Sequence, residues 1–160
     1  MFDAFLSIEG VDSESTRKGF EGQIEIQSFS IGANNPTSIG AGGGAGAGKV
    51  NVGNFNVMKK TDAASPLLFQ ACCTGKHFPK ATVTFHKAGE QQMVFLEYKF
   101  DTVFIEDIQW SGASGGDEVP MESLSLAFGK IEMAYTKQKP DGTPDASIVA
   151  GWNLMTVTAE

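Results

Sequence analysis

Positive charge is scarce in this chain: Arg17 is the only arginine, and the net charge is −7. Proteins that bind nucleic acid neutralise phosphates with clustered lysine and arginine side chains. The low content of these residues therefore argues against a nucleic-acid partner. The sequence also lacks an apolar run of about 18 residues, which a membrane-spanning helix needs. We therefore expect no insertion into a membrane.

Cysteine and histidine are scarce as well. The two cysteines, Cys72 and Cys73, are adjacent, and the histidines are His77 and His86. Neighbouring residues in a helix point about 100° apart, so the cysteines are poorly placed to pair with each other. This pattern is typical of a chain that folds in a reducing cytoplasm. Because potential ligands are so few, we expect no metal and no other cofactor.

The first residues lack a basic stretch followed by an apolar run, which predicts that no cleavable signal peptide is used. Glycine, in contrast, is abundant, with 19 residues among 160. A chain of this length is most simply one domain, 1–160, that is large enough for a core. Many of the glycines lie in a long loop at 32–48, whose small side chains cannot build a core. A loop of this length is usually functional or disordered.

Alternation of apolar and polar residues predicts a mainly β protein. The expected strands are 2–9, 23–31, 49–58, 81–87, 92–110, 119–136 and 148–157. In three of these strands the apolar phase changes partway. In 23–31 this indicates either a bulge or burial on both faces. In 49–58 and 119–136 we interpret it as bulges at Gly53 and Gly129. In 92–110 we expect Phe104 to share the inward phase of Tyr98 and Phe100. The sheet should curl into a compact β-barrel of seven or more antiparallel strands.

A single helix is predicted, at about 66–74. Ser65 is suited to the N-cap, because its hydroxyl can accept a hydrogen bond from the first turn. Pro66 is tolerated at the first helical position, and Gly75 is suited to the position that ends the helix. A helix this short is not stable alone, so we expect it to flank the barrel.

Two motifs point to possible chemistry. The run from Gly43 to Lys49 matches the start of a phosphate-binding loop, but Val50 stands where Ser or Thr is needed, and a strand follows in place of a helix. Cys72 and His77 could act as nucleophile and base, although a cysteine on the apolar side of a short helix is more often a core residue. The alternative function is therefore a soluble β-barrel enzyme using Cys72 and His77 or the glycine-rich loop.

Large apolar residues also occupy the second face of several strands. A monomer rarely exposes so many of them, so they predict an interface between subunits. The alternative is that the strand parity is misassigned at these positions. The residues are Phe5, Phe29, Ile31, Phe55 and Phe95.

Several motifs, in order along nearly the whole chain, resemble the Hcp (haemolysin-coregulated protein) family, the tube proteins of the bacterial type VI secretion system. The helical motif is Ser65-Pro66-x-Leu68-Phe69-x-Ala71-Cys72-x-x-Gly75-Lys76-His77. The other matching stretches are Phe2 to Gly10, Gly48 to Val52, Ala81 to Gly89, Gly129 to Ile131 and Ala150 to Asn153. The chain departs from the family pattern in a glycine-richer loop at 40–48 and in Cys73.

The resemblance implies a β-barrel with one flanking helix that assembles into hexameric rings. The rings stack into a tube inside a contractile sheath. The tube assembles in the cytoplasm, is then secreted with a spike or tip protein, and can carry small effectors in its lumen. This predicts a structural and carrier protein that is not an enzyme.

The resemblance also implies roles for particular segments. The loop 31–49 is expected to contact the next ring. The expected contact residues are Ile39, Gly42, Gly44, Gly46, Gly48 and Lys49. The lumen should be lined by small polar strand residues, for which Thr82 and Thr84 are the candidates.

Overall fold

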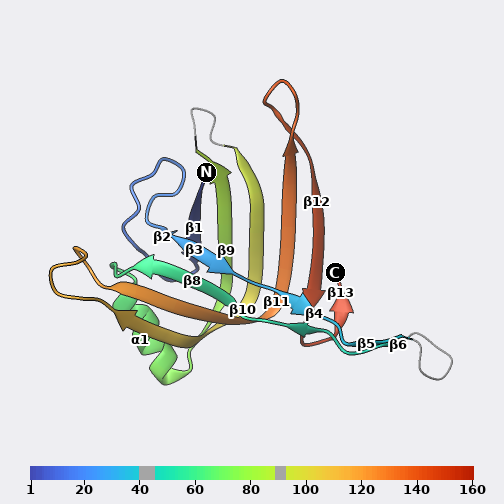
Figure 1. Ribbon diagram of the computed structural model, residues 1–160, viewed down its shortest axis with the longest axis horizontal. Helices are drawn as coiled ribbons and strands as arrows, with labels where there is room; N and C mark the ends of the chain where they lie inside the picture. The colour runs from blue at the N-terminus through green and yellow to red at the C-terminus, as the bar shows by residue number, and fades with distance from the viewer. Residues whose placement is uncertain (40–45, 89–92) are drawn as a thin grey trace.

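The computed structural model describes residues 1–39, 46–88 and 93–160 (Figure 1). These ranges contain one helix, α1 (Ser65–Thr74), and thirteen strands. The strands are β1 (Phe2–Ile8), β2 (Ile24–Ile26), β3 (Ser28–Ser30), β4 (Ala33–Asn34), β5 (Thr37–Ser38), β6 (Gly46–Ala47), β7 (Asn51–Val52), β8 (Phe55–Lys60), β9 (His77–Lys87), β10 (Val94–Ser111), β11 (Met121–Gln138), β12 (Pro144–Asn153) and β13 (Thr158–Ala159).

The main sheet curls into a barrel. Hydrogen-bonded pairing runs through β2, β1, β9, β10, β11, β8 and β3, always antiparallel. β2 and β3 are consecutive and are separated only by Gln27, whose N–H donates to the carbonyl of Met58 at 2.8 Å. The pairing therefore returns to its starting point, which confirms the predicted β-barrel with one flanking helix.

The bend at Gln27 explains the phase change predicted within 23–31. Ile24 and Ile26 are buried, and Phe29, which has the opposite parity, packs against the same core. The strand reverses its faces where it bends, so both sets of side chains point inward. The ring of Phe29 stacks on that of Phe55 with centroids 5.6 Å apart.

A second change of phase occurs in β10 and β11, and here two predictions were wrong. Asp101 pairs with Lys130 and Val103 with Phe128, so no residue is inserted opposite Gly129 and there is no bulge at this position. The register shift of this pair lies farther along, between Ile105 and Asp107. Both strands instead turn together, and this brings Val103 inside and leaves Phe104 40% exposed.

The helix begins and ends close to the predicted positions, but its N-terminus is built differently. Ala64 is the N-cap and makes no side-chain capping bond. The Ser65 hydroxyl accepts from the backbone N–H of Asp62 at 3.0 Å, so it closes a turn before the helix and does not cap it. At the other end, Gly75 adopts the predicted left-handed conformation, with φ 71°. Leu68 and Ala71 cover the barrel core.

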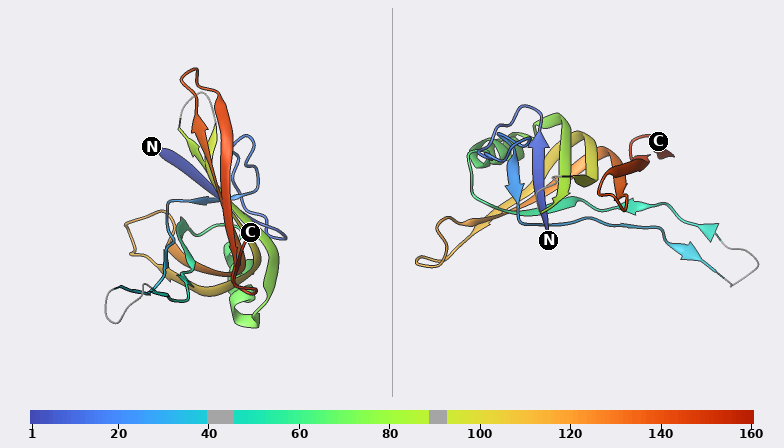
Figure 2. Two further views of the ribbon diagram at one scale, coloured as in Figure 1. Left: turned by 90° about the vertical axis from the view of Figure 1, so that its right-hand side faces the viewer. Right: turned by 90° about the horizontal axis from the view of Figure 1, so that it is seen from above.

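The described residues on the two sides of the glycine-rich segment, 33–38 and 46–52, form an arm. β4 pairs with β7, and β5 pairs with β6, so the two sides of the arm are joined as a narrow antiparallel ribbon. Figure 2 shows this ribbon extending away from the barrel. Across the described ranges, no helix is both long and apolar enough to cross a membrane.

Candidate assembly surfaces

The apolar face of the sheet continues beyond the barrel. In the barrel, this face carries core residues such as Val83 and Tyr98, and the next partner of Tyr98 across the sheet is Met133. Met133 is 43% exposed, and Tyr135 and Ile148, which pair with each other one step along, are 46% and 72% exposed. The side chains that would form a core on this part of the sheet are therefore uncovered. We call Met133, Tyr135 and Ile148 the outer apolar face.

The edge of the sheet next to this face is also open. On the side away from β11, β12 pairs with β13 only at Trp152 and Asn153. Among the described residues, the stretch from Pro144 to Ala150 has no strand partner on that side. Unpaired strand edges readily accept another strand. An uncovered apolar face and an open edge thus occur on the same strand.

A groove separates the outer apolar face from the base of the arm. It has a volume of about 640 Å³ and is bounded on one side by the arm and on the other by the sheet and by Val157, which follows β12. Its apolar lining includes Ile31, Val50, Val52, Tyr98, Trp152 and Val157. The arm therefore leaves the barrel next to the exposed apolar surface.

The other face of the same sheet is polar. Ser7 lies beside Thr82, Thr82 beside Lys99, and Lys99 beside Glu132 in successive strands. Lys99 Nζ is 3.2 Å from Glu97 Oε1. Thr82 therefore belongs to a row of polar side chains that crosses the sheet.

Thr84 lies on this polar face but is less accessible. It is half-buried, and its hydroxyl is buried without a hydrogen-bond partner. It pairs with Phe5, whose ring stacks on Phe20 at 4.6 Å and on the ring of His86 at 5.6 Å. The segment between β1 and β2 thus covers this part of the polar face.

Lys130 and Glu160 form an ion pair at the base of the polar face. The hydrogen bond from Lys130 holds the pKa of Glu160 below its usual value, and a weaker hydrogen bond from Asn153 adds to this effect. The same contact raises the pKa of Lys130. The pair ties the C-terminal residue to β11.

Two of the five residues predicted to form an interface lie inside the subunit, and the other three are half-buried. Phe5 and Phe55 are 1% and 0% exposed, so they offer almost no surface to a partner. Phe5 is on the second face of β1 but is covered by Phe20, and Phe55 points into the barrel. Phe29, Ile31 and Phe95 are half-buried against the core. Covering by a loop explains why the strand parity misplaced Phe5, and the reversal at the Gln27 bend explains why Phe29 packs against the core. An interface role for Phe29, Ile31 and Phe95 stays a prediction.

A buried ionic cluster, which the sequence did not indicate, joins the helix to the barrel. Lys59 Nζ lies 2.8 Å from Glu122 Oε2 and 2.9 Å from Asp62 Oδ1. Lys59 also donates to the Ser65 hydroxyl at 3.2 Å, and the indole N–H of Trp110 donates to Glu122 at 2.8 Å. Lys59 and Glu122 occupy inward positions of β8 and β11, where the alternation predicts apolar residues. No motif in the sequence indicates that these two charged residues meet.

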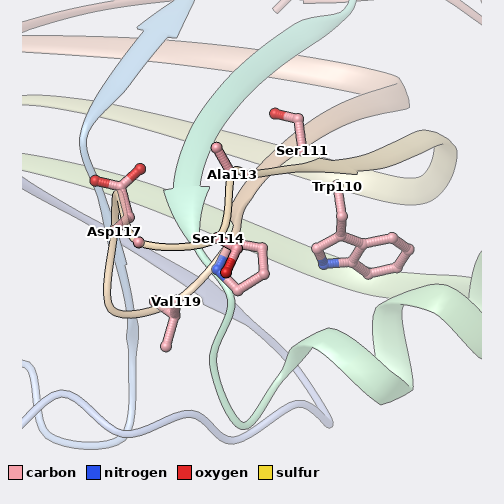
Figure 3. A pocket seen from close by; sticks show the side chains of 9 residues that line it. Trp110, Ser111, Ala113, Ser114, Asp117 and Val119 are labelled. Atoms are coloured by element: carbon pink, nitrogen blue, oxygen red, sulfur yellow. The ribbon is translucent and has the colours of Figure 1, made fainter.

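Trp110 also borders a shallow hollow of about 460 Å³ formed by the loop between β10 and β11. Figure 3 shows Trp110 on one side of this hollow and Asp117 on the other. The ring of Phe69, on the helix, meets Trp110 edge-on at 5.8 Å.

Comparison with known proteins identifies the family. The family described as "Type VI secretion system effector, Hcp" matches residues 5–135. The chain belongs to the Hcp family. It is 37% identical over 154 residues to Protein hcp1 of Pseudomonas aeruginosa, with 95% of this chain and 94% of that protein covered. This relationship confirms the resemblance seen in the sequence motifs.

Solved structures agree with this assignment. One, described as a type six secretion system protein, matches with a TM-score of 0.95 and 30% identity over all of both chains. Hcp1 from Salmonella typhimurium matches with a TM-score of 0.82 and 29% identity over 99% of each chain. The protein is therefore a structural subunit of the type VI secretion tube, and it belongs to a family of secreted tube proteins.

The residues of the alternative enzyme function lie on different elements of this Hcp chain. Cys72 is half-buried on α1 and its Sγ is 4.0 Å from the carbonyl oxygen of Glu106. His77 begins β9, is exposed, and lies against the ring of Phe104. Among the described residues, no hydrogen bond joins Cys72 to His77, and no group of three potential ligands could hold a metal.

The glycine-rich residues of the Hcp chain do not form a phosphate-binding turn where they are described. Gly46 and Ala47 form β6 and pair with β5, and the element that follows Lys49 is the strand β7, not a helix. Ile39, Gly46, Gly48 and Lys49 are exposed on the arm. Gly42 and Gly44 lie outside the described residues.

Proposed function

We propose that this chain forms hexameric rings that stack into the secretion tube. In this proposal the tube assembles in the cytoplasm inside a sheath, is exported with a spike protein and without a cleavable signal, and carries small effectors in its lumen. The main support is the outer apolar face, which continues the core face of the sheet but has no cover within the described residues. The chain acts as a structural and carrier component, with no catalytic step.

The outer apolar face is the proposed contact between neighbouring subunits in a ring. A ring uses heterologous contacts, in which one surface of each subunit meets a different surface of the next. Burial of apolar surface contributes about 25 cal/mol per Å², and Met133, Tyr135 and Ile148 offer such surface beside an open strand edge. Of the residues predicted from strand parity, Ile31 stays in this proposal, because it lines the adjoining groove.

The polar face of the sheet is the proposed lumen wall. Its row of polar residues includes Thr82, and its charges are paired, as in Lys99 with Glu97. A surface with paired charges and small hydroxyl groups has little apolar area to retain a passing protein. Thr84 contributes less, since its hydroxyl is covered.

The arm is the proposed contact between stacked rings. It extends away from the barrel, and its described residues Ile39, Gly46, Gly48 and Lys49 are exposed (Figure 2). The presence of glycine at position 48 has a specific structural explanation. A Cβ added there would clash with the carbonyl oxygen of Pro36. Glycine at 48 therefore allows the two sides of the arm to approach closely.

Two substitutions on adjacent residues of β12 test the proposal. Ile148→Asp places a carboxylate on the outer apolar face and should abolish rings, whereas Val149→Asp, on the polar face, should retain them. Light scattering after size-exclusion chromatography gives the oligomer mass, and negative-stain imaging shows the rings. A strict monomer of the unaltered chain at high concentration would refute the ring. Equal effects of the two substitutions would refute the choice of face.

A further inference from the structure

The arm and a β-hairpin project from opposite ends of the subunit. The hairpin is formed by β10 and β11, and we call its end, residues 111–120, the hairpin tip. β8 pairs with β11 from Phe55, opposite Leu126, to Lys60, opposite Met121. The arm joins the chain before Phe55, whereas the hairpin tip lies beyond Met121. Figure 1 and the right-hand view of Figure 2 show the two projections with the barrel between them.

The two projections carry opposite charges. Lys49 is the only charged residue between 26 and 58, so the arm is positive. Between 108 and 121 the only charged residues are Asp117 and Glu118, so the hairpin tip is negative. All three residues are exposed, and none of them takes part in an ion pair within the described part of the chain. These charges are therefore available to another molecule.

The groove at the base of the arm is suited to hold a projecting loop. It has a volume of about 640 Å³, and Lys49 is the only charged residue among the described residues that line it. Val50 and Val52 line it from the arm, and Trp152 lines it from the sheet. The hairpin tip offers Val119, which is 36% exposed and follows the two carboxylates. An apolar side chain next to carboxylates matches an apolar groove that carries one ammonium group.

A stack of rings needs two different surfaces at opposite ends of each subunit. A heterologous contact that does not close on itself generates an open filament, in which each subunit turns one surface to the next subunit and the other surface to the previous one. The groove and the hairpin tip meet this requirement. One is hollow and carries an ammonium group, whereas the other projects and carries two carboxylates.

We propose that the hairpin tip of one subunit docks in the groove at the base of the arm of a subunit in the next ring, with Asp117 and Glu118 facing Lys49. This contact rests on the proposed stacking of rings. The rings then stack head to tail, with all arms pointing the same way. A single exposed ion pair is weak, but every ring repeats the contact around its circumference, so many weak pairs act together.

Reversal of the arm charge tests the contact. Lys49→Glu turns attraction into repulsion, and we expect the protein concentration at which half of the rings are stacked to rise by about tenfold or more. Lys49→Glu combined with Asp117→Lys and Glu118→Lys exchanges the charges and should restore stacking. Lys139→Glu changes an exposed lysine of another turn and, as the matched control, should leave stacking unchanged. Sedimentation velocity over a range of concentrations separates single rings from stacks, and circular dichroism verifies folding.

Cross-linking of the unaltered chain detects the contact directly. A carbodiimide joins an amine to a carboxylate only where the two groups touch. Within one subunit the six residues of β8, which span about 20 Å, separate the arm from the hairpin tip. A product that joins Lys49 to Asp117 or Glu118 must therefore link two subunits. Mass spectrometry should find this product in the stacked fraction, and single rings should lack it.

The outcomes separate the docking contact from the ring. The contact is overturned, while stacked rings stand, if Lys49→Glu stacks as readily as the unaltered chain, if exchange of the charges does not restore stacking, or if Lys49 cross-links to carboxylates elsewhere. If unaltered rings form but do not stack, the contact and the stacking fail together and the ring stands. If no rings form, all three fail. If a variant does not fold, the cross-link decides.

Discussion

Lys59 and Glu122 form an ion pair of 2.8 Å whose side chains are both completely buried. They lie opposite each other on β8 and β11, and the pair is extended by Asp62 and Trp110. Removing two charges from water offsets much of their mutual attraction, so a buried ion pair contributes little more to folding stability than apolar residues of similar size would. A single charge left buried without its partner, however, strongly destabilises the fold. The cluster therefore fixes how the helix meets the barrel.

Removal of one charge should strongly destabilise the subunit. Lys59→Met leaves Glu122 buried without its ammonium partner, and we expect the free energy of unfolding to fall by about 3–5 kcal/mol. Urea denaturation followed by tryptophan fluorescence measures this change. Adding Glu122→Gln should recover much of the loss, because the amide oxygen can still accept from Trp110. Lys60, the exposed neighbour of Lys59, provides the control variant Lys60→Met. Equal losses of unfolding free energy in Lys59→Met and Lys60→Met would contradict the prediction.

Two phenylalanines face the opposite way from the sequence-based prediction, since Phe55 of β8 is buried and Phe104 of β10 is exposed. Phe55→Ala should lower the free energy of unfolding by about 3–5 kcal/mol, since it opens a cavity in the core. Phe104→Ala should cost less than about 1 kcal/mol, because a surface side chain loses little burial. Chemical denaturation of both variants compares them. A larger loss for Phe104→Ala would contradict the observed facing of β10.

The Lys130–Glu160 pair predicts a pH dependence. The pKa of Glu160 is lowered from its ordinary 4.5 when the chain is folded, so its contribution to stability is present above that value and is lost as pH falls through the folded pKa. The pKa of Lys130 is raised from 10.5, so its contribution is present below that value and is lost as pH rises through the folded pKa. In an NMR titration of the Glu160 carboxyl, Lys130→Met should raise its pKa, whereas Lys139→Met should not. An unchanged pKa in Lys130→Met would contradict the role of the pair.

Shortening the arm should separate ring formation from stacking. Deletion of residues 40–46 removes Gly46 of β6 and none of the barrel strands, so the subunit should fold and form single rings. Long stacks should become rarer, because the proposed ring-to-ring contact is lost. Sedimentation velocity distinguishes single rings from stacks. Unfolding of the subunit, or stacking at the original level, would contradict the assignment of the arm.

Much of the fold could be predicted because local patterns carry it. Alternation located the barrel strands, and the Pro66 and Gly75 signals located the helix within a residue. Alternation could not tell a bulge from a turn of two paired strands, which is why Gly129 and Phe104 were misassigned. At the turn, Thr102 has a left-handed backbone conformation and lies opposite Gly129, whose carbonyl accepts from the N–H of Leu154.

The assembly surfaces were less predictable than the family. By its position in β1, Phe5 lies on the face expected to be exposed, yet the ring of Phe20, from the segment after β1, covers it. Met133 and Ile148 follow the parity of core residues, yet nothing described in the subunit covers them. A strand pattern reports which face a side chain takes, but not what lies over that face.

By itself, the sequence determined the class of fold, the position of the helix and, through its ordered motifs, the Hcp family, because these depend on local periodicity and on matching residues along one chain. Only the tertiary structure decided that Phe5 and Phe55 are internal, that Lys59 meets Glu122, and that the apolar face continues past the barrel. Burial and ion pairing are properties of segments brought together from distant parts of the chain, and register and closure of the sheet determine which segments meet.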